Sequence, residues 1–375
     1  MPSKPLKPQM FPDYFGWIDA LRGFAAISVV IFHYTHFYMA DAAARPIQVA
    51  LTDIPYSAYL WPFYQFGEVA VRLFWVISGF VFAHVYWQRD TMAREFAVAR
   101  FARLYPLHFA TLVLVALLQT ISLKSTGHWQ VFENNDLRHF ALQVFMMDHG
   151  LNMSNGLSFN GPIWSVSSEI LVYLLFFATL PFTKSRPLVA SAFLSIAAFG
   201  VLSIRPETFP VSQWVFICGV FFFAGSAIFA LYRVLNGLTS RLLPTILILV
   251  TLAWVAFKLG STNAMLLSAC CVIVLALATL ENHASGKAKV VRFFGDISFS
   301  IYLVHIPIQI AVLIVADLLF AGSRNFAGHG AALPAYLIAS IGIAYLTNRY
   351  FEMPVAQWLR RNLNDASKRQ NPPVL

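Results

Sequence analysis

Apolar residues in this chain gather into ten blocks, most of them about 20 residues long, separated by short polar segments. A helix of that length crosses the hydrocarbon core of a bilayer. The pattern therefore predicts an all-α integral membrane protein, a bundle of about ten transmembrane helices. The predicted helices cover residues 15–38, 67–87, 104–123, 164–183, 188–204, 214–232, 242–259, 264–281, 297–320 and 334–351.

The composition supports this class of protein. Of 375 residues, 58% are hydrophobic and only 11% are charged, whereas a soluble domain carries roughly 25% charged residues. Cys218, Cys270 and Cys271 all lie inside apolar blocks, so neither a disulfide framework nor a zinc site is predicted. The basic residues are not gathered into an aromatic-rich basic module, and we therefore expect no nucleic-acid partner.

The basic residues between the blocks predict the orientation in the membrane. With the N-terminus inside, 18 Lys and Arg residues fall on the inner side and 6 on the outer side, as the positive-inside rule requires. We expect both termini to be cytoplasmic. The predicted units are a Pro-rich tail over 1–14 that is not a cleaved signal, a transmembrane domain over 15–351, and a second tail over 352–375.

The longest connection, residues 124–163, is predicted to lie on the outer side. It combines Trp129, Phe132 and Phe159 with Asn, Asp and His residues. Such a mixture suits a carbohydrate, but it is equally typical of an interfacial aromatic belt. The apolar stretch 137–147 within it is too short to span, so we expect it to lie in the interface or to re-enter the membrane.

The first predicted helix contains Arg22 and His33, and ionisable residues inside a membrane helix suggest a functional site. Eleven positions at 100° and 1.5 Å per residue place both on one side of the helix, about 16 Å apart in depth. This spacing predicts a polar track through the bundle. The structural alternative for Arg22 is an ion pair with Asp19 on the preceding turn.

The fourth predicted helix contains Glu169, which lies about as far from the outer end of its helix as His33 does from the end of the first. We therefore predict that Glu169 meets His33 and orients the ring as a general base. A structural pair between two helices is the alternative. Ser165 and Tyr173 share the face of Glu169 and extend a polar stripe inward.

Three further features of the helices have mainly structural interpretations. Glu68 and Arg72 are spaced to form an ion pair near the outer interface. Ser78 and Gly79 allow close helix packing. His305 is either a hydrogen-bonded core residue or part of a site.

Arg100 and Arg103 lie on one face at the inner edge of the third predicted helix. Guanidinium groups suit phosphate oxygens. The two arginines therefore predict either a site for a phosphorylated ligand or an anchor to the phosphates of membrane lipids.

Six motifs follow one another across most of the chain: IDALRGFAAISVVIFH, FWVISGFV, ARFARLYPLH, NGPIWSVSSEILVY, FFGDISFSIYLVHIP and NRYFEMP. In sequence and order they resemble the motifs of acyltransferase family 3, the membrane O-acyltransferases of bacterial surface carbohydrates. Arg72 and Trp75 depart from the family's usual second-helix pattern.

The resemblance implies a multi-pass enzyme of the bacterial cytoplasmic (inner) membrane. It implies acetyl-CoA, or another acyl-CoA, as a donor on the cytoplasmic side, with no metal. The implied acceptor is a carbohydrate hydroxyl of a surface polysaccharide, O-antigen, exopolysaccharide or lipid-linked oligosaccharide. The matching residues are His33, Glu169 and Arg22 for catalysis and Arg100, Arg103 and again Arg22 for the donor. Supporting residues are Ser78, Trp164, Tyr302, His305 and Glu352, and helix position adds Asp19 and Tyr173.

A transporter or flippase for a lipid-linked sugar or an acyl donor is the alternative function, since charges inside a membrane also mark transport pathways. The discontinuous helix pairs typical of transporters are not evident in the sequence.

Overall fold

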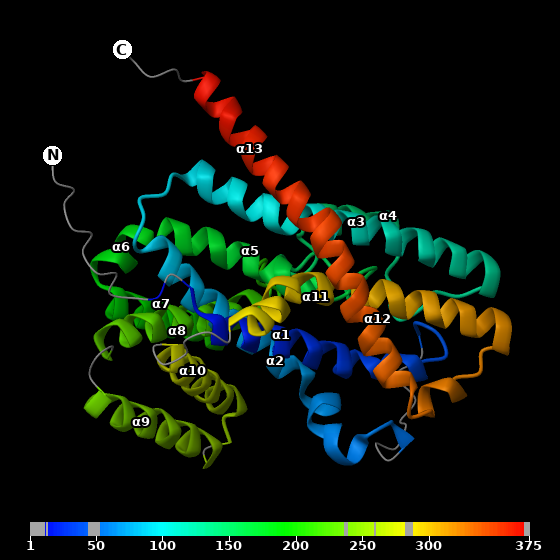
Figure 1. Ribbon diagram of the computed structural model, residues 1–375, viewed down its shortest axis with the longest axis horizontal. Helices are drawn as coiled ribbons and strands as arrows, with labels where there is room; N and C mark the ends of the chain where they lie inside the picture. The colour runs from blue at the N-terminus through cyan, green and yellow to red at the C-terminus, as the bar shows by residue number, and fades with distance from the viewer. Residues whose placement is uncertain are drawn as a thin grey trace.

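The computed structural model describes residues 12, 14–43, 53–235, 239–258, 260–281 and 288–370. Within these ranges the protein is all-helical, and its extended contact is one isolated bridge between Leu151 and Val211. The elements, shown in Figure 1, are α1 (Gly16–His33), η1 (Tyr34–Tyr38), α2 (Ser57–Tyr86), α3 (Ala93–Thr126), α4 (Leu137–Val144), α5 (Ile163–Ala178), α6 (Leu180–Ser185), α7 (Pro187–Ile204), α8 (Gln213–Leu235), α9 (Thr239–Lys258), α10 (Thr262–Leu280), α11 (Ala288–Phe320), η4 (Asn325–Gly328), α12 (Ala332–Thr347), the π-helix η5 (Asn348–Glu352) and α13 (Met353–Gln370).

All ten predicted apolar segments fall in helices, and the stretch 164–183 is divided between α5 and α6. Seven helices among the described residues are long and apolar enough to cross a membrane. Helix α3 begins well before its apolar stretch, at Ala93. The reason is that backbone hydrogen bonding continues through charged residues that a hydropathy pattern excludes.

The centre of the bundle is built from close backbone contacts. A Cβ on Gly79 of α2 would lie 1.7 Å from the carbonyl oxygen of Phe222, and one on Gly225 of α8 would lie 2.0 Å from that of Val76. The α2–α8 crossing therefore requires glycine on both helices, as the Ser78–Gly79 pattern predicts. Helix α1 packs in the same way against α11, where Gly23 and Gly295 face Phe294 and Asp19.

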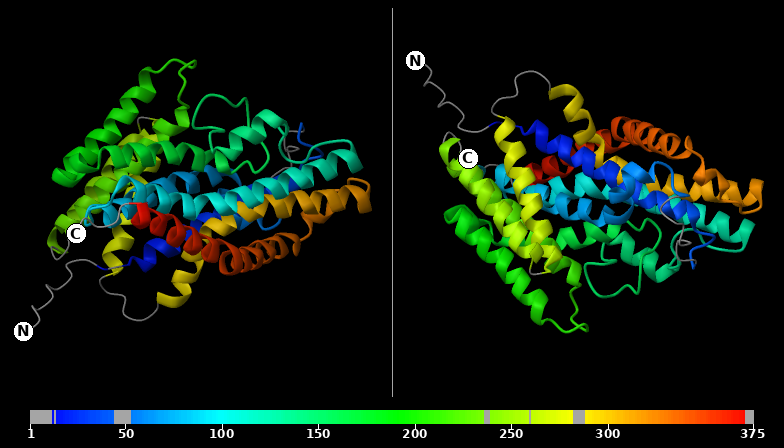
Figure 2. Two further views of the ribbon diagram at one scale, coloured as in Figure 1. Left: turned by 90° about the horizontal axis from the view of Figure 1, so that it is seen from above. Right: turned by 90° about the horizontal axis from the view of Figure 1, so that it is seen from below.

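Helices α9 and α10 lie at the edge of the bundle, at the lower left of Figure 1. The views of Figure 2 agree with Figure 1 that the start of α1 and the end of α13 lie toward the same end of the molecule.

The predicted C-terminal tail contains a helix. After α12 the chain makes the π-helix η5 and continues directly into α13, which packs along α3. Arg94 of α3 donates to the carbonyl oxygen of Leu363, 2.5 Å away. The predicted N-terminal tail lies almost entirely outside the described residues.

The connection between α3 and α5 folds back into the bundle. Asn160 donates to the carbonyl oxygen of Leu303 at 3.1 Å, and the hydroxyl of Tyr302 donates to that of Pro162 at 2.8 Å. The two α11 residues in these bonds, Leu303 as acceptor and Tyr302 as donor, are buried. Helix α5 therefore begins deep in the protein, about midway along α11 and well short of its C-terminal end.

The glycine contacts give a stability prediction. We expect Gly79→Val to destabilise the folded protein by about 2 kcal/mol or more, because the added carbons overlap the α8 backbone. Gly200→Val is the matched control, since a Cβ there meets nothing within 4 Å. Thermal unfolding in detergent, followed by size-exclusion chromatography, measures both. Equal midpoints for the two variants would contradict the close crossing.

Candidate functional site

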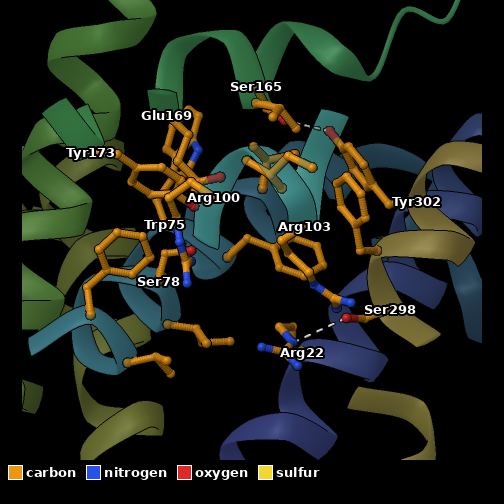
Figure 3. Close-up of a pocket in the computed structure, with 18 residues that line it drawn as sticks. Arg22, Trp75, Ser78, Arg100, Arg103, Ser165, Glu169, Tyr173, Ser298 and Tyr302 are labelled. Atoms are coloured by element: carbon orange, nitrogen blue, oxygen red, sulfur yellow. Dashed lines mark hydrogen bonds between the residues drawn. The ribbon is translucent and has the colours of Figure 1, made fainter. Parts of the chain in front are cut away.

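A cavity of about 160 Å³ lies between α1, α2, α3, α5 and α11. Figure 3 shows the side chains that line it, with Glu169, Arg100 and Ser78 toward one side and Tyr302, Arg103 and Ser298 toward the other. Three arginines, Arg22, Arg100 and Arg103, line this one cavity. The structure thus brings together the three cations that the sequence placed on two separate helices.

Arg22 is held by partners on two helices. Its Nη2 lies 2.8 Å from Asp19 Oδ1, so the i, i+3 ion pair is confirmed. On α11 it donates to the hydroxyl of Ser298 at 3.2 Å and to the carbonyl oxygen of Gly295 at 2.9 Å. These bonds fix the guanidinium at the floor of the cavity.

Glu169 lies on the opposite wall, beside Ser78, Tyr173 and Arg100. Its Oε1 is buried and, among the described residues, has no hydrogen-bond partner. The guanidinium of Arg100 stacks 4.7 Å from the ring of Phe82, and its Nε also lacks a partner there. Glu169 and Arg100 therefore form a charged wall that still has hydrogen-bonding capacity for a ligand.

Arg103 forms a buried ion pair with Glu352. The side chain of Glu352 is 1% exposed and also accepts hydrogen bonds from Ser300 and Asn348. Because Glu352 is the last residue of η5, the ion pair joins α3, α11 and the start of the C-terminal helix at the cavity wall.

His33 pairs with His305. Its Nδ1 lies 2.9 Å from Nε2 of His305, and the rings stack at 5.0 Å between centroids. Nδ1 of His305 lies 3.1 Å from the carbonyl oxygen of Ile301, which can only accept, so the neutral His305 carries its proton on Nδ1. His305 Nε2 then accepts from His33 Nδ1–H. This leaves Nε2 of His33 unprotonated, as a general base requires.

A third histidine, His36, lies beside this pair. Gln309 of α11 donates to the carbonyl oxygen of His33 at 2.7 Å, which orients its amide. Its Oε1 then accepts from Nδ1 of His36 at 3.1 Å. His33, His36, His305 and Gln309 thus form one polar cluster near the end of α1.

The predicted meeting of His33 with Glu169 is wrong, because the described contacts place the two in different parts of the bundle. Helix α5 begins where Pro162 contacts Tyr302, one turn inward of His305. Glu169 lies seven residues further along α5, about 10 Å further inward. The prediction assumed that α1 and α5 begin and end at the same depth.

Tyr302 separates the two parts of the site. Its hydroxyl lies 2.7 Å from that of Ser165, and both residues line the cavity. The ring of Tyr302 is 6.2 Å from that of His305. On the α5 side, Trp164 packs edge-on against Trp75 at 5.9 Å. Tyr302 therefore lies between the cavity, which it lines, and His305.

Two contacting residues of α11, Ser298 and Gln309, escaped the sequence prediction, although the helix carried a signal. Ser298, Tyr302, His305 and Gln309 are spaced by three or four residues, so they share one helix face. Their hydrogen-bond partners are Arg22, Ser165, His33 and His36, in that order. A polar stripe along an otherwise apolar helix was the available signal.

Two remaining points concern the predicted ion pair of α2 and metal binding. Glu68 and Arg72 lie 3.9 Å apart, so their predicted ion pair is confirmed. Among the described residues, no group of three or more His, Cys, Asp or Glu side chains is arranged to hold a metal ion.

Comparison with known proteins shows which family this chain belongs to. A family profile described as "Acyltransferase domain" matches residues 15–349. The "O-acetyl transferase" of Shigella phage Sf6 is 21% identical over 92% of this chain and 96% of its own length. "Acyltransferase MdmB" of Streptomyces mycarofaciens is 27% identical over 42% of this chain and 37% of its own length.

"Protein 2 in picA locus" of Rhizobium radiobacter is 37% identical over 28% of this chain and 46% of its own length. No solved structure matches the chain significantly.

The Arg103–Glu352 pair gives a second stability prediction. We expect Glu352→Leu to destabilise the protein by about 3 kcal/mol, because it leaves the guanidinium of Arg103 without its partner. The double variant Arg103→Met/Glu352→Leu should recover part of that loss. Denaturant unfolding in detergent micelles measures all variants. A double variant as unstable as the sum of both single ones would show that the pair is not coupled.

Proposed function

Because this chain belongs to acyltransferase family 3 and is therefore an acyltransferase, we propose that it moves an acetyl group from cytoplasmic acetyl-CoA to a carbohydrate hydroxyl beyond the membrane. The observation that carries the proposal is the arginine-lined cavity that lies below an imidazole with a free nitrogen. The arginines of the cavity recruit an anionic donor, and the free nitrogen of the imidazole accepts a proton.

We place the protein in the bacterial inner membrane with ten crossings and both termini cytoplasmic. The charge asymmetry between the two sides supports this orientation. Arg22, Arg100 and Arg103 then lie toward the cytoplasm and His33 toward the outer face. The acceptor, a surface polysaccharide, O-antigen, exopolysaccharide or lipid-linked oligosaccharide, approaches His33 from outside.

The donor arm enters the cavity past Arg103 and Arg100. Guanidinium groups stabilise the phosphates of the donor by charge-assisted hydrogen bonds. Arg22 lies about 16 Å below His33, so an extended arm held at the arginines can present its thioester toward the outer half of the bundle. Tyr302 and Ser165 must move aside for the thioester to reach His33.

His33 acts as the general base. Its Nε2 takes the proton of the acceptor hydroxyl while that oxygen attacks the thioester carbonyl carbon. The carbon–sulfur bond breaks, and the proton passes from His33 to the departing sulfur. His305 accepts the hydrogen bond from His33 Nδ1 and so fixes the productive tautomer, the role the sequence assigned to Glu169.

Glu169 has a different role in this proposal. Its carboxylate compensates the charge of Arg100 in apolar surroundings and keeps the guanidinium in the cavity wall. Ser78 and Tyr173 hold the carboxylate in place. Glu169 therefore affects binding of the donor rather than proton transfer.

Purified protein incubated with labelled acetyl-CoA tests the reaction. We expect thioester consumption in the presence of acceptor, lowered roughly 10²- to 10⁴-fold by His33→Gln. The exposed His329 provides the control His329→Gln, which should leave the rate unchanged. Glu169→Gln should raise the KM for the donor more than it lowers kcat. Full activity of His33→Gln refutes the general base, and absence of consumption by wild-type protein favours the transporter alternative.

The acceptor can be identified in cells. We expect mass spectrometry of surface glycans to show the loss of acetyl groups when the gene is deleted, and their return with the wild-type gene but not with the His33→Gln gene. Glycans of unchanged mass in every strain would exclude a surface carbohydrate acceptor.

A further inference from the structure

A second hollow adjoins the cavity lined by Arg22, Arg100 and Arg103, which we call the donor cavity. It has a volume of about 590 Å³ and lies between α3, α11, the end of α12 and α13. Four arginines line it, Arg103, Arg292, Arg349 and Arg360, together with one carboxylate, Asp296. We call this hollow the arginine groove. Arg103 lines both spaces, so the groove is the part of the surface next to the donor cavity.

The charge of the groove is only partly compensated. Arg103 is paired with Glu352, and Arg292 lies 3.6 Å from Asp296 at a well-exposed position. Arg349 donates to the neutral hydroxyl of Tyr345. Among the described residues, no carboxylate lies within ion-pair distance of Arg349 or Arg360.

Arg360 also lies in a field of like charge. Burial and the nearby charge of Arg100 both lower the pKa of its guanidinium. Positive groups held close together without counterions bind an anion that carries several negative charges. The groove therefore favours a ligand with more than one phosphate group.

The groove also has an aromatic wall. The rings of Phe293 and Tyr345 pack with 5.6 Å between their centroids, and both line the groove. Aromatic faces beside guanidinium groups can stack the base of a nucleotide. Gln357 of α13 adds an exposed amide.

We propose that the arginine groove binds the phosphorylated nucleotide end of the donor, with Arg349 and Arg360 as the phosphate ligands and Phe293 and Tyr345 as the base platform. This inference rests on the proposed function, because it assigns one end of the same donor. Arg103 then marks the point where the donor passes from the groove into the cavity.

The headgroup of an anionic lipid offers the same phosphate chemistry, so the test must separate the two sources. The protein is reconstituted in nanodiscs of purely phosphatidylcholine and in nanodiscs containing phosphatidylglycerol. Adenosine 3′,5′-bisphosphate is titrated as the probe. Initial rates are measured with acetyl-CoA and with acetyl-pantetheine, a donor without the nucleotide.

We expect Arg349→Gln and Arg360→Gln each to weaken binding of the bisphosphate and raise the KM for acetyl-CoA by roughly 10-fold. The KM for acetyl-pantetheine should not change, since this donor does not enter the groove. Arg361→Gln is the matched control, a neighbouring exposed arginine of α13 that does not line the groove. These effects should be the same in both kinds of nanodisc.

Three results overturn the inference: bisphosphate binding that neither variant weakens, a KM that rises equally for both donors, or effects that occur only with phosphatidylglycerol, which would assign the groove to a lipid headgroup. A wild-type protein that transfers acetyl from neither donor refutes the proposed function instead. Bisphosphate titration then still decides whether the groove binds a nucleotide.

Discussion

The structure depends on one constraint: charged groups inside the apolar bundle need polar partners, which come from the same helix and from neighbouring helices. Arg22 of α1 pairs with Asp19 of its own helix and donates to α11, and Arg103 of α3 pairs with Glu352 at the end of η5. The contacts between helices set their register, because displacement by one turn would break the bonds of Arg22 to α11 and leave Arg103 and Glu352 unpaired. The polar groups that suit chemistry therefore also align the helices.

The sequence predicted the parts of this arrangement that follow from periodicity. Each predicted apolar block lies in a helical part of the described chain, and i, i+3 and i, i+4 spacing correctly paired Arg22 with Asp19 and Arg72 with Glu68. The relative depth of separate helices was not predictable in this way. The start of α5 is set by hydrogen bonds of Asn160 and Pro162 to α11, which join residues about 140 positions apart.

That difference in depth alters the chemical interpretation. An imidazole beside a carboxylate would work as a charged pair, whereas His33 lies beside a second imidazole, His305, whose Nδ1 faces a backbone carbonyl. The carboxylate of Glu169 remains with the arginines instead. The carboxylate with the arginines and the pair of imidazoles thus lie in separate parts of the bundle, with Tyr302 between them.

The π-helix between α12 and α13 limits the insertions and deletions that this part of the chain can accept. A π-turn is an α-helix with one additional residue. Without that residue, everything after Glu352 would rotate by about 100° around the helix axis. Glu352 and the groove-facing side of α13 keep their orientations together only while the segment Asn348–Glu352 retains its five residues. The spacing between these positions, and not only their chemical identity, is therefore under structural constraint.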